Sequence, residues 1–247
     1  SILNTNNQEK REEIYRDLIV KAGDNYNQIN SYIKVAKSLK KSKKVLKIIE
    51  QLAHVKTHLE AILAQTIFRI IDHKVVKSEE KVVSIFEEHT DVIVKSRREV
   101  EFGHKIFLTT GKSNLVLDCQ IEQGNPSDAI KFMDLVNAQN KLYERFPRQI
   151  SADGGFSSKD NVLNAKKSGV KDVCFSKRCG LKILEIVKSS YVYNKLKNFR
   201  AGIESNISAL KRGFGLDRAT WKGLSGYKSY IWSALVSYNL TILSNKV

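Results

Sequence analysis

The sequence predicts an α/β protein in which an all-helical N-terminal region precedes a mixed sheet flanked by helices. Residues 1–80 contain no proline and a single glycine, Gly23, and their apolar residues recur at helical spacing. From residue 81 onward, short runs of β-branched and aromatic residues alternate with helical patterns. We therefore divide the chain into a helical region, residues 1–80, and an α/β domain, residues 81–247.

The helical region is predicted to hold three or four amphipathic helices, with breaks near Gly23 and around residues 40–44. Seven lysines gather at the second break: Lys34, Lys37, Lys40, Lys41, Lys43, Lys44 and Lys47. Such a cluster is either a solvated helix face or a surface that contacts phosphates. The residues alone do not decide between these two readings.

The α/β region opens with β-type runs at residues 82–85, 92–94 and 100–102. Residues 111–114 are a turn signal, so we expect 102–109 and 115–121 to pair as antiparallel strands. A helix is predicted from Asp128 to Phe146, stopped by Pro147. Further along we expect strands at 148–152 and 170–175, and helices at 159–167, 180–199, 200–212 and 225–244. This order predicts one mixed sheet covered on both faces.

Composition narrows the class of partner. The formal net charge is +16 and the sequence pI is about 9.7, which favours a polyanionic partner, although a lysine-rich proteome would give the same excess. Three cysteines, an odd and sparse number, argue against a disulfide framework and for a reducing compartment. No apolar run reaches the ~18 residues of a membrane span, so we expect a cytoplasmic protein.

Asp153 is the first candidate for chemistry. It follows a short apolar strand and precedes two glycines. Carboxylates at strand ends in α/β sheets point into the crevice where ligands bind, and glycines let a metal ion or a nucleic-acid backbone approach closely. The alternative is that Asp-Gly-Gly is simply a good turn.

Glu204 is the second candidate. In a helix, Arg200, Glu204 and Lys211 lie on one stripe, because they are four and seven residues apart. This stripe is either an exposed ladder of ion pairs or part of a phosphate site. Phosphodiester chemistry uses two divalent ions roughly 3.5–4 Å apart. Carboxylates hold such ions, and neighbouring cationic side chains bind the flanking phosphates.

The chain resembles the catalytic domain of DDE insertion-sequence transposases, especially the group filed as ISNCY (not yet classified). The similar segments cover more than half of the chain and occur in the same order: Ser84–Val94, Arg98–Lys105, Asp153–Phe156, Phe199–Leu216 and Trp221–Gly223. Residues 10–80 are similar to the helical insertion that this group carries within its catalytic domain.

The resemblance implies an RNase H-like fold and a Mg²⁺- or Mn²⁺-dependent cutting and joining of double-stranded DNA at element ends and target sites. It maps Asp153 and Glu204 onto two catalytic, metal-binding carboxylates. Related transposases carry a Tyr-x₂-Arg-x₃-Glu-x₆-Lys signature, in which Arg200, Glu204 and Lys211 match and Lys197 replaces the tyrosine. Arg200, Lys211, Lys197 and His104 are thus the candidate DNA contacts. For His104, a structural role is the favoured alternative.

One departure from the family concerns the first catalytic Asp, which should sit on an opening strand before the helical insertion. We expect that strand to be missing, the chain to be the C-terminal part of a transposase and the carboxylate triad to be incomplete; Asp72 and Asp91 are weak substitutes. The rival readings are an inactive DNA-binding remnant and a pseudogene product. We also expect a bacterial, nucleoid-associated protein that can self-associate, with its C-terminal aromatic residues in helix packing rather than base stacking.

Overall fold

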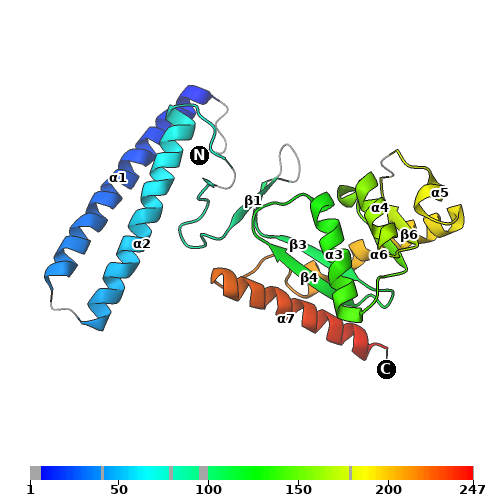
Figure 1. The fold of residues 1–247 in the computed structure, drawn as a ribbon. Coiled ribbons are helices and arrows are strands. Elements are labelled where there is room, and N and C mark those ends of the chain that lie inside the picture. The colour runs from blue at the N-terminus through cyan, green and yellow to red at the C-terminus, as the bar shows by residue number, and fades with distance from the viewer. Residues whose placement is uncertain (1–6, 40–41, 78–79, 95–99, 178–179, 247) are drawn as a thin grey trace. The chain divides into compact units, whose positions relative to one another are not determined.

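The computed structural model describes residues 7–39, 42–77, 80–94, 100–177 and 180–246. The chain forms two compact units, residues 1–102 and 103–247 (Figure 1). The boundary expected between residues 80 and 81 stays a prediction. Lys40, Lys41 and Arg98, named above, lie outside the described residues, and so does Cys179, one of the three cysteines.

The first unit begins with a helical hairpin. Helix α1 spans Gln8–Ser38, helix α2 spans Lys43–Thr66, and a π-helical turn, η2, follows at Ile67–Ile71. The side chains of Asn7 and Ser42 cap the two helices by accepting hydrogen bonds from backbone N–H groups. The expected break around residues 40–44 is confirmed by where α1 ends and α2 begins.

The break expected at Gly23 is wrong, because α1 runs through it without interruption. A glycine inside a helix costs only about 0.5–1 kcal/mol relative to alanine. Contacts along the hairpin offset this cost, since α1 packs on α2. Tyr26 joins the helices by donating a hydrogen bond of 2.8 Å to Glu60, and the ammonium of Lys56 lies 5.1 Å from the centre of the Tyr26 ring.

The segment after the hairpin is less regular than expected. Residues 82–85, predicted as a strand, have no regular secondary structure. Instead, the Gln65 amide pairs with both backbone groups of Val82, at 2.7 and 3.0 Å, and so takes the place of a partner strand. Strands β1, Asp91–Val94, and β2, Val100–Gly103, lie where β-type runs were predicted, and they pair with each other, which the sequence did not predict.

The second unit opens with the predicted antiparallel hairpin of β3, Lys105–Thr110, and β4, Val116–Glu122. Helix α7, Gly223–Ser244, packs on β4 (Figure 1). The side chain of Asn239 anchors the helix by bonding both the N–H and the carbonyl of Val116, at 2.9 and 2.8 Å. These two bonds fix α7 to the start of β4 through backbone groups of the strand.

A second layer of elements carries Asp153. Helix α3, Asp128–Tyr143, leads to strand β5, Gln149–Ala152, a 3₁₀ turn at Gly154–Phe156 and helix α4, Lys159–Lys167. Strand β6, Asp172–Phe175, pairs with β5 in parallel, and the short helix α5, Ile183–Ile186, follows it. Helix α3 ends three residues before the expected Phe146, because Glu144 takes a left-handed conformation.

Helix α6, Ser190–Gly213, is one continuous helix, so the division expected at residue 200 is wrong. Its two ends enter two different apolar clusters. Val192 and Leu196 pack with β5, β6, α3 and α4, whereas Leu210 packs with β3, β4 and α7. The central turns of α6 therefore lie between two cores, and these turns carry Arg200 and Glu204.

The described strands pair two by two, in three separate two-stranded sheets, and not in the single mixed sheet that we expected. Parallel and antiparallel pairing both occur, as in a mixed α/β fold. The RNase H-like arrangement of one continuous sheet stays a prediction. None of the described helices combines the length and the apolar character needed to cross a membrane.

Candidate active site

Asp153 stands at the carboxyl end of β5, as the sequence predicts. Its Oδ1 atom accepts hydrogen bonds from the backbone N–H of Gly154, at 2.7 Å, and from the hydroxyl of Ser176, at 3.1 Å. Ser176 directly follows β6, so the ends of two adjacent parallel strands meet at this carboxylate. The side chain remains 67% exposed and therefore accessible to a ligand.

The two glycines after Asp153 are required by close packing. A Cβ atom on Gly155 would overlap the Asp128 carboxylate at the start of α3, and one on Gly154 would lie 2.8 Å from the Ser176 hydroxyl. Asp128 is itself held by an ion pair of 2.6 Å with Lys105. The turn that carries Asp153 is thus packed closely between α3 and the end of β6.

Glu204 lies in the middle of α6, and a specific hydrogen bond holds this helix against β5. The Ser151 hydroxyl donates to the carbonyl oxygen of Leu196, at 2.9 Å. Ser151 is two residues before Asp153, and Leu196 is one turn before Arg200. This bond therefore holds the part of α6 that carries Arg200 close to the end of β5.

Arg200 joins the two predicted carboxylates. Its Nη1 atom lies 3.0 Å from Oε1 of Glu204 and 3.4 Å from Oδ1 of Asp153. The two carboxylate oxygens are therefore no further apart than the sum of those distances. The Nε atom of Arg200 is buried, and none of the described residues accepts a hydrogen bond from it. An unpaired buried donor costs about 1–3 kcal/mol, so stability alone does not account for this position.

Two further candidates lie on the same stripe of α6. Lys197 precedes Arg200 by three residues, Lys211 follows Glu204 by seven, and both side chains are exposed. With a rise of ~1.5 Å per residue, Lys211 is about 10 Å along the helix axis from Glu204. The structure thus places three cations on the helix that carries Glu204, and among the described side chains only the Arg200 guanidinium reaches both carboxylates.

His104 is placed differently. Its side chain is only 6% exposed, and its ring meets that of Tyr227 edge to face, with centroids 5.1 Å apart. This geometry supports the structural role that the sequence left as the favoured alternative. A DNA contact from His104 stays a prediction that its burial disfavours.

The cationic side chains also act on a buried thiol beneath the site. Cys174, on β6, is almost fully buried, and this burial raises its pKa. Ser151, Lys197 and Arg200 act in the opposite direction, because a hydrogen bond and nearby positive charges favour the thiolate. The second described cysteine, Cys119, is likewise free and buried.

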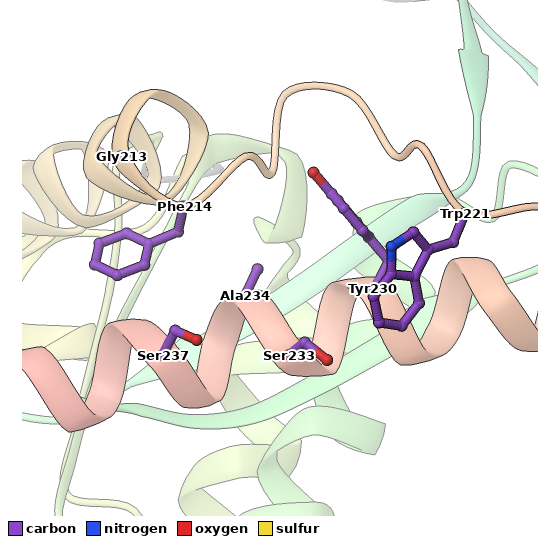
Figure 2. A pocket seen from close by; sticks show the side chains of 7 residues that line it. All are labelled: Gly213, Phe214, Trp221, Tyr230, Ser233, Ala234 and Ser237. Atoms are coloured by element: carbon purple, nitrogen blue, oxygen red, sulfur yellow. The ribbon is translucent and has the colours of Figure 1, made fainter.

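The C-terminal end of α6 borders a surface hollow, whose lining comes from that end, the following loop and one face of α7 (Figure 2): Gly213, Phe214, Trp221, Tyr230, Ser233, Ala234 and Ser237. The Tyr230 hydroxyl donates to the carbonyl oxygen of Gly215, at 2.8 Å. Tyr227, Tyr230 and Tyr238 pack into the adjacent core as predicted. Trp221 and Trp232 are about half exposed, although the Trp221 ring packs edge to face on that of Tyr230, with centroids 5.7 Å apart.

Sequence reasoning missed Ser176 and Asp128, which position the Asp153 turn. A usable signal existed for Ser176, because it directly follows a predicted strand and the carboxyl ends of parallel strands share one edge of a sheet. The contact between Asp128 and Gly155 joins residues from separate elements, and no local sequence pattern predicts it.

Two carboxylates meet at this site. Among the described residues, neither Asp153 nor Glu204 belongs to a group of three Asp, Glu, His or Cys residues whose ligand atoms all lie within 4.8 Å of one another. Asp72 ends the π turn of the first unit, and Asp91 begins β1. The two carboxylates fit a divalent ion such as Mg²⁺ by donor type, since hard cations prefer oxygen ligands. Arg200 competes with such an ion for both of them.

Comparison with known families decides the identity. The sequence model described as "Transposase DDE domain" matches residues 64–240, more than half of the chain. The chain belongs to the DDE transposase family. Searches of the curated proteins and of the solved structures gave no significant match.

Membership of the DDE transposase family connects the site to a class of chemistry. DDE transposases act on DNA and generally use divalent metal ions. The matched range contains Asp153, Arg200, Glu204 and Lys211, so the whole stripe of α6 lies inside the transposase domain. The match does not separate subgroups of DDE transposases, and the ISNCY-like assignment stays a prediction.

Proposed function

We propose that Asp153 and Glu204 are two of the carboxylates with which this transposase domain holds Mg²⁺ or Mn²⁺ for cutting and joining DNA strands. Bound ions would activate the attacking oxygen and stabilise the leaving oxygen of a phosphodiester. Arg200, Lys197 and Lys211 would bind the phosphates on either side of the scissile bond. The observation that carries this proposal is the pairing of Arg200 with both carboxylates, because it brings together residues 51 positions apart in the sequence.

Arg200 has two roles in this proposal. Without DNA, its guanidinium lies between two exposed carboxylates and reduces the repulsion between them. With a phosphate and a divalent ion bound, the two carboxylates would hold the ion and the guanidinium would pair with the phosphate. Arginine suits this exchange, since its planar fork pairs with carboxylate and phosphate in the same bidentate manner.

The first experiment measures DNA binding. The Arg200→Ala, Lys211→Ala double variant is compared with a Lys167→Ala, Lys171→Ala variant, which removes the same charge from exposed lysines at the far end of α4 and just before β6. We expect the first variant to bind duplex DNA more weakly. The slope of log K against log salt concentration should also become shallower, by the amount that about two lost phosphate contacts produce. Equal losses in both variants would show that net charge, and not this stripe, binds DNA.

The second experiment measures metal binding. Asp153→Asn and Glu204→Gln are each expected to lower the affinity for Mn²⁺ by at least about tenfold, because each replaces a charged ligand with a neutral one. Asp160→Asn, which changes an exposed carboxylate in the first turn of α4, is the matched control and should leave the affinity unchanged. Unaltered Mn²⁺ binding in Asp153→Asn would refute the metal assignment.

A second candidate function is DNA binding without strand cleavage. It is favoured by the number of carboxylates, since two-metal chemistry uses a triad and the described residues bring two together at this site. Nicking of supercoiled plasmid in the presence of Mn²⁺ separates the two functions. Nicking that Asp153→Asn and Glu204→Gln abolish supports the catalytic function, whereas DNA binding without nicking supports the non-catalytic one.

We also propose that the protein self-associates through its helical hairpin and works at the bacterial nucleoid. None of the described residues of α1 is fully buried, and Val20, Tyr32 and Val35 expose more than half of their surface. Light scattering on Val20→Asp, Val35→Asp and on the unaltered chain tests the proposal. A species of the same mass in both samples would contradict it.

A further inference from the structure

A cluster of histidine and glutamate lies in the first unit, outside the site discussed above. His54 and His58 are four residues apart on α2 and therefore lie on the same face of the helix. Their rings are 4.6 Å apart between centroids, at an angle of 64°. Glu88, from the segment of residues 81–90 that follows the hairpin, completes the group.

The three side chains converge on one point. Oε1 of Glu88 lies 2.6 Å from Nε2 of His54, and Oε2 lies 3.0 Å from Nε2 of His58. One ligand atom from each residue lies within 4.8 Å of the other two. In a tetrahedral Zn²⁺ site with bonds of about 2.0–2.1 Å, neighbouring ligand atoms are roughly 3.3 Å apart. To reach that separation, the 2.6 Å contact of His54 must lengthen by roughly 0.7 Å and the 3.0 Å contact of His58 by roughly 0.3 Å.

The hydrogen bonding of His58 suits a metal ligand. Its Nδ1 atom lies 2.9 Å from the carbonyl oxygen of His54, and because a carbonyl can only accept, Nδ1 carries the proton. If the imidazole is neutral, the lone pair of Nε2 faces Glu88, and either a second ring proton or a metal ion can lie between these two atoms, which are 3.0 Å apart. A backbone carbonyl that fixes the tautomer in this way is the usual outer partner of a metal-bound histidine.

The segment that carries Glu88 is fastened to α2 at a second point. The Gln65 amide holds Val82, so residues 82–88 run along the helix from Gln65 back to His58 and His54. Residues 54, 58 and 65 share one stripe of the helix, since 58 lies about one turn after 54 and 65 lies about two turns after 58. A bound ion would therefore hold the Glu88 end of this segment against α2, while Gln65 already holds the Val82 end.

We propose that His54, His58 and Glu88 form a Zn²⁺ site that fastens residues 81–90 to α2. Two imidazole nitrogens and one carboxylate suit Zn²⁺, with water completing the tetrahedron, because the side chains of His54 and Glu88 are partly exposed. Mg²⁺ prefers all-oxygen sites. This site is thus chemically distinct from the carboxylates of the second unit, and the inference does not depend on the proposed function.

The test is a Zn²⁺ titration of the full chain, in competition with a chromophoric chelator and with excess Mg²⁺ to occupy oxygen-only sites. His54→Ala, His58→Ala is the test variant. His73→Ala is the matched control, because His73 forms a histidine–carboxylate pair of 3.5 Å with Glu12 in the same unit. We expect the unaltered chain and His73→Ala to bind one more equivalent of Zn²⁺ than the double variant. Glu88→Gln should weaken that equivalent by at least about tenfold.

Hydrogen exchange supplies a second measurement that does not depend on counting ions. Zn²⁺ should slow the exchange of the backbone amides of residues 82–90 in the unaltered chain, and should not do so in the double variant. Circular dichroism checks that the helical hairpin persists. Equal Zn²⁺ binding by the double variant and the unaltered chain, or an equal loss in His73→Ala, would overturn the proposal and leave the cluster as two ion pairs.

Discussion

Arg200 reaches across from α6 to Asp153 at the end of β5, with Nη1 3.4 Å from Oδ1. The same nitrogen lies 3.0 Å from Glu204, one turn further along the helix. A single guanidinium thus holds together two carboxylates that a divalent ion would otherwise join.

Removal of the arginine should strengthen metal binding while it weakens DNA binding. In Arg200→Ala, the two carboxylates lose their competing cation, and we expect a roughly two- to fivefold gain in Mn²⁺ affinity, since an exposed ion pair is worth about 0.2–1 kcal/mol. Isothermal titration with Mn²⁺ measures the change. Arg212→Ala removes the same charge from the last turn of α6, where Arg212 bonds to Ser208, and serves as the control. A lower Mn²⁺ affinity in Arg200→Ala would contradict the competition.

The turn after Asp153 should not tolerate a side chain at Gly155. In Gly155→Ala, the new Cβ atom displaces the Asp128 carboxylate, which Lys105 holds, and we expect a loss of about 1–3 kcal/mol in the free energy of unfolding. Gly202→Ala is the control, because a Cβ atom there meets nothing within 4 Å inside α6 and should stabilise by about 0.4–1 kcal/mol.

Tryptophan fluorescence suits this comparison, because the two tryptophans of the chain, Trp221 and Trp232, both lie in the second unit. Urea unfolding curves for the two glycine variants and the unaltered chain then report the unfolding of the unit that contains the site. Similar stability of Gly155→Ala and Gly202→Ala would show that the turn can adjust at no cost.

Alkaline pH should destabilise the second unit through Cys119. Burial, helped by the negative charge of Asp118, raises the pKa of this thiol from 9.0 to about 12. The unfolded chain loses the thiol proton near pH 9 and the folded chain does not. The free energy of unfolding should therefore fall as the pH rises from about 9 toward 12. Urea unfolding at several pH values checks this, and a Cys119→Ala variant with the same dependence would contradict it.

The anchor between α7 and the β3–β4 hairpin should be sensitive to the loss of one amide. Asn239→Ala leaves the N–H and the carbonyl of Val116 without their partner, so we expect a loss of about 1–3 kcal/mol. Asn194→Ala, at an exposed position of α6, should change the stability by less than about 0.5 kcal/mol. The prediction fails if thermal unfolding places both variants at the same midpoint.

Much of the local structure could be predicted from the sequence. The antiparallel hairpin, the strand before Asp153 and helix α4 all appear where periodicity, turn residues and caps placed them. These elements depend on neighbours in the chain, which a local pattern records. The errors at Gly23 and residue 200 came from giving too much weight to single positions, because packing along a long helix outweighs one unfavourable residue.

The sequence by itself determined which residue types are available for metal and phosphate chemistry, and the spacing of Arg200, Glu204 and Lys211 on one helix. Only the tertiary structure decided that Arg200 touches Asp153, that Ser176 and Asp128 hold its turn, and that His104 is buried. The reason is physical. Helical spacing is a property of neighbouring residues, whereas these contacts join segments far apart in the chain, and their geometry follows from how α6 packs between two apolar cores.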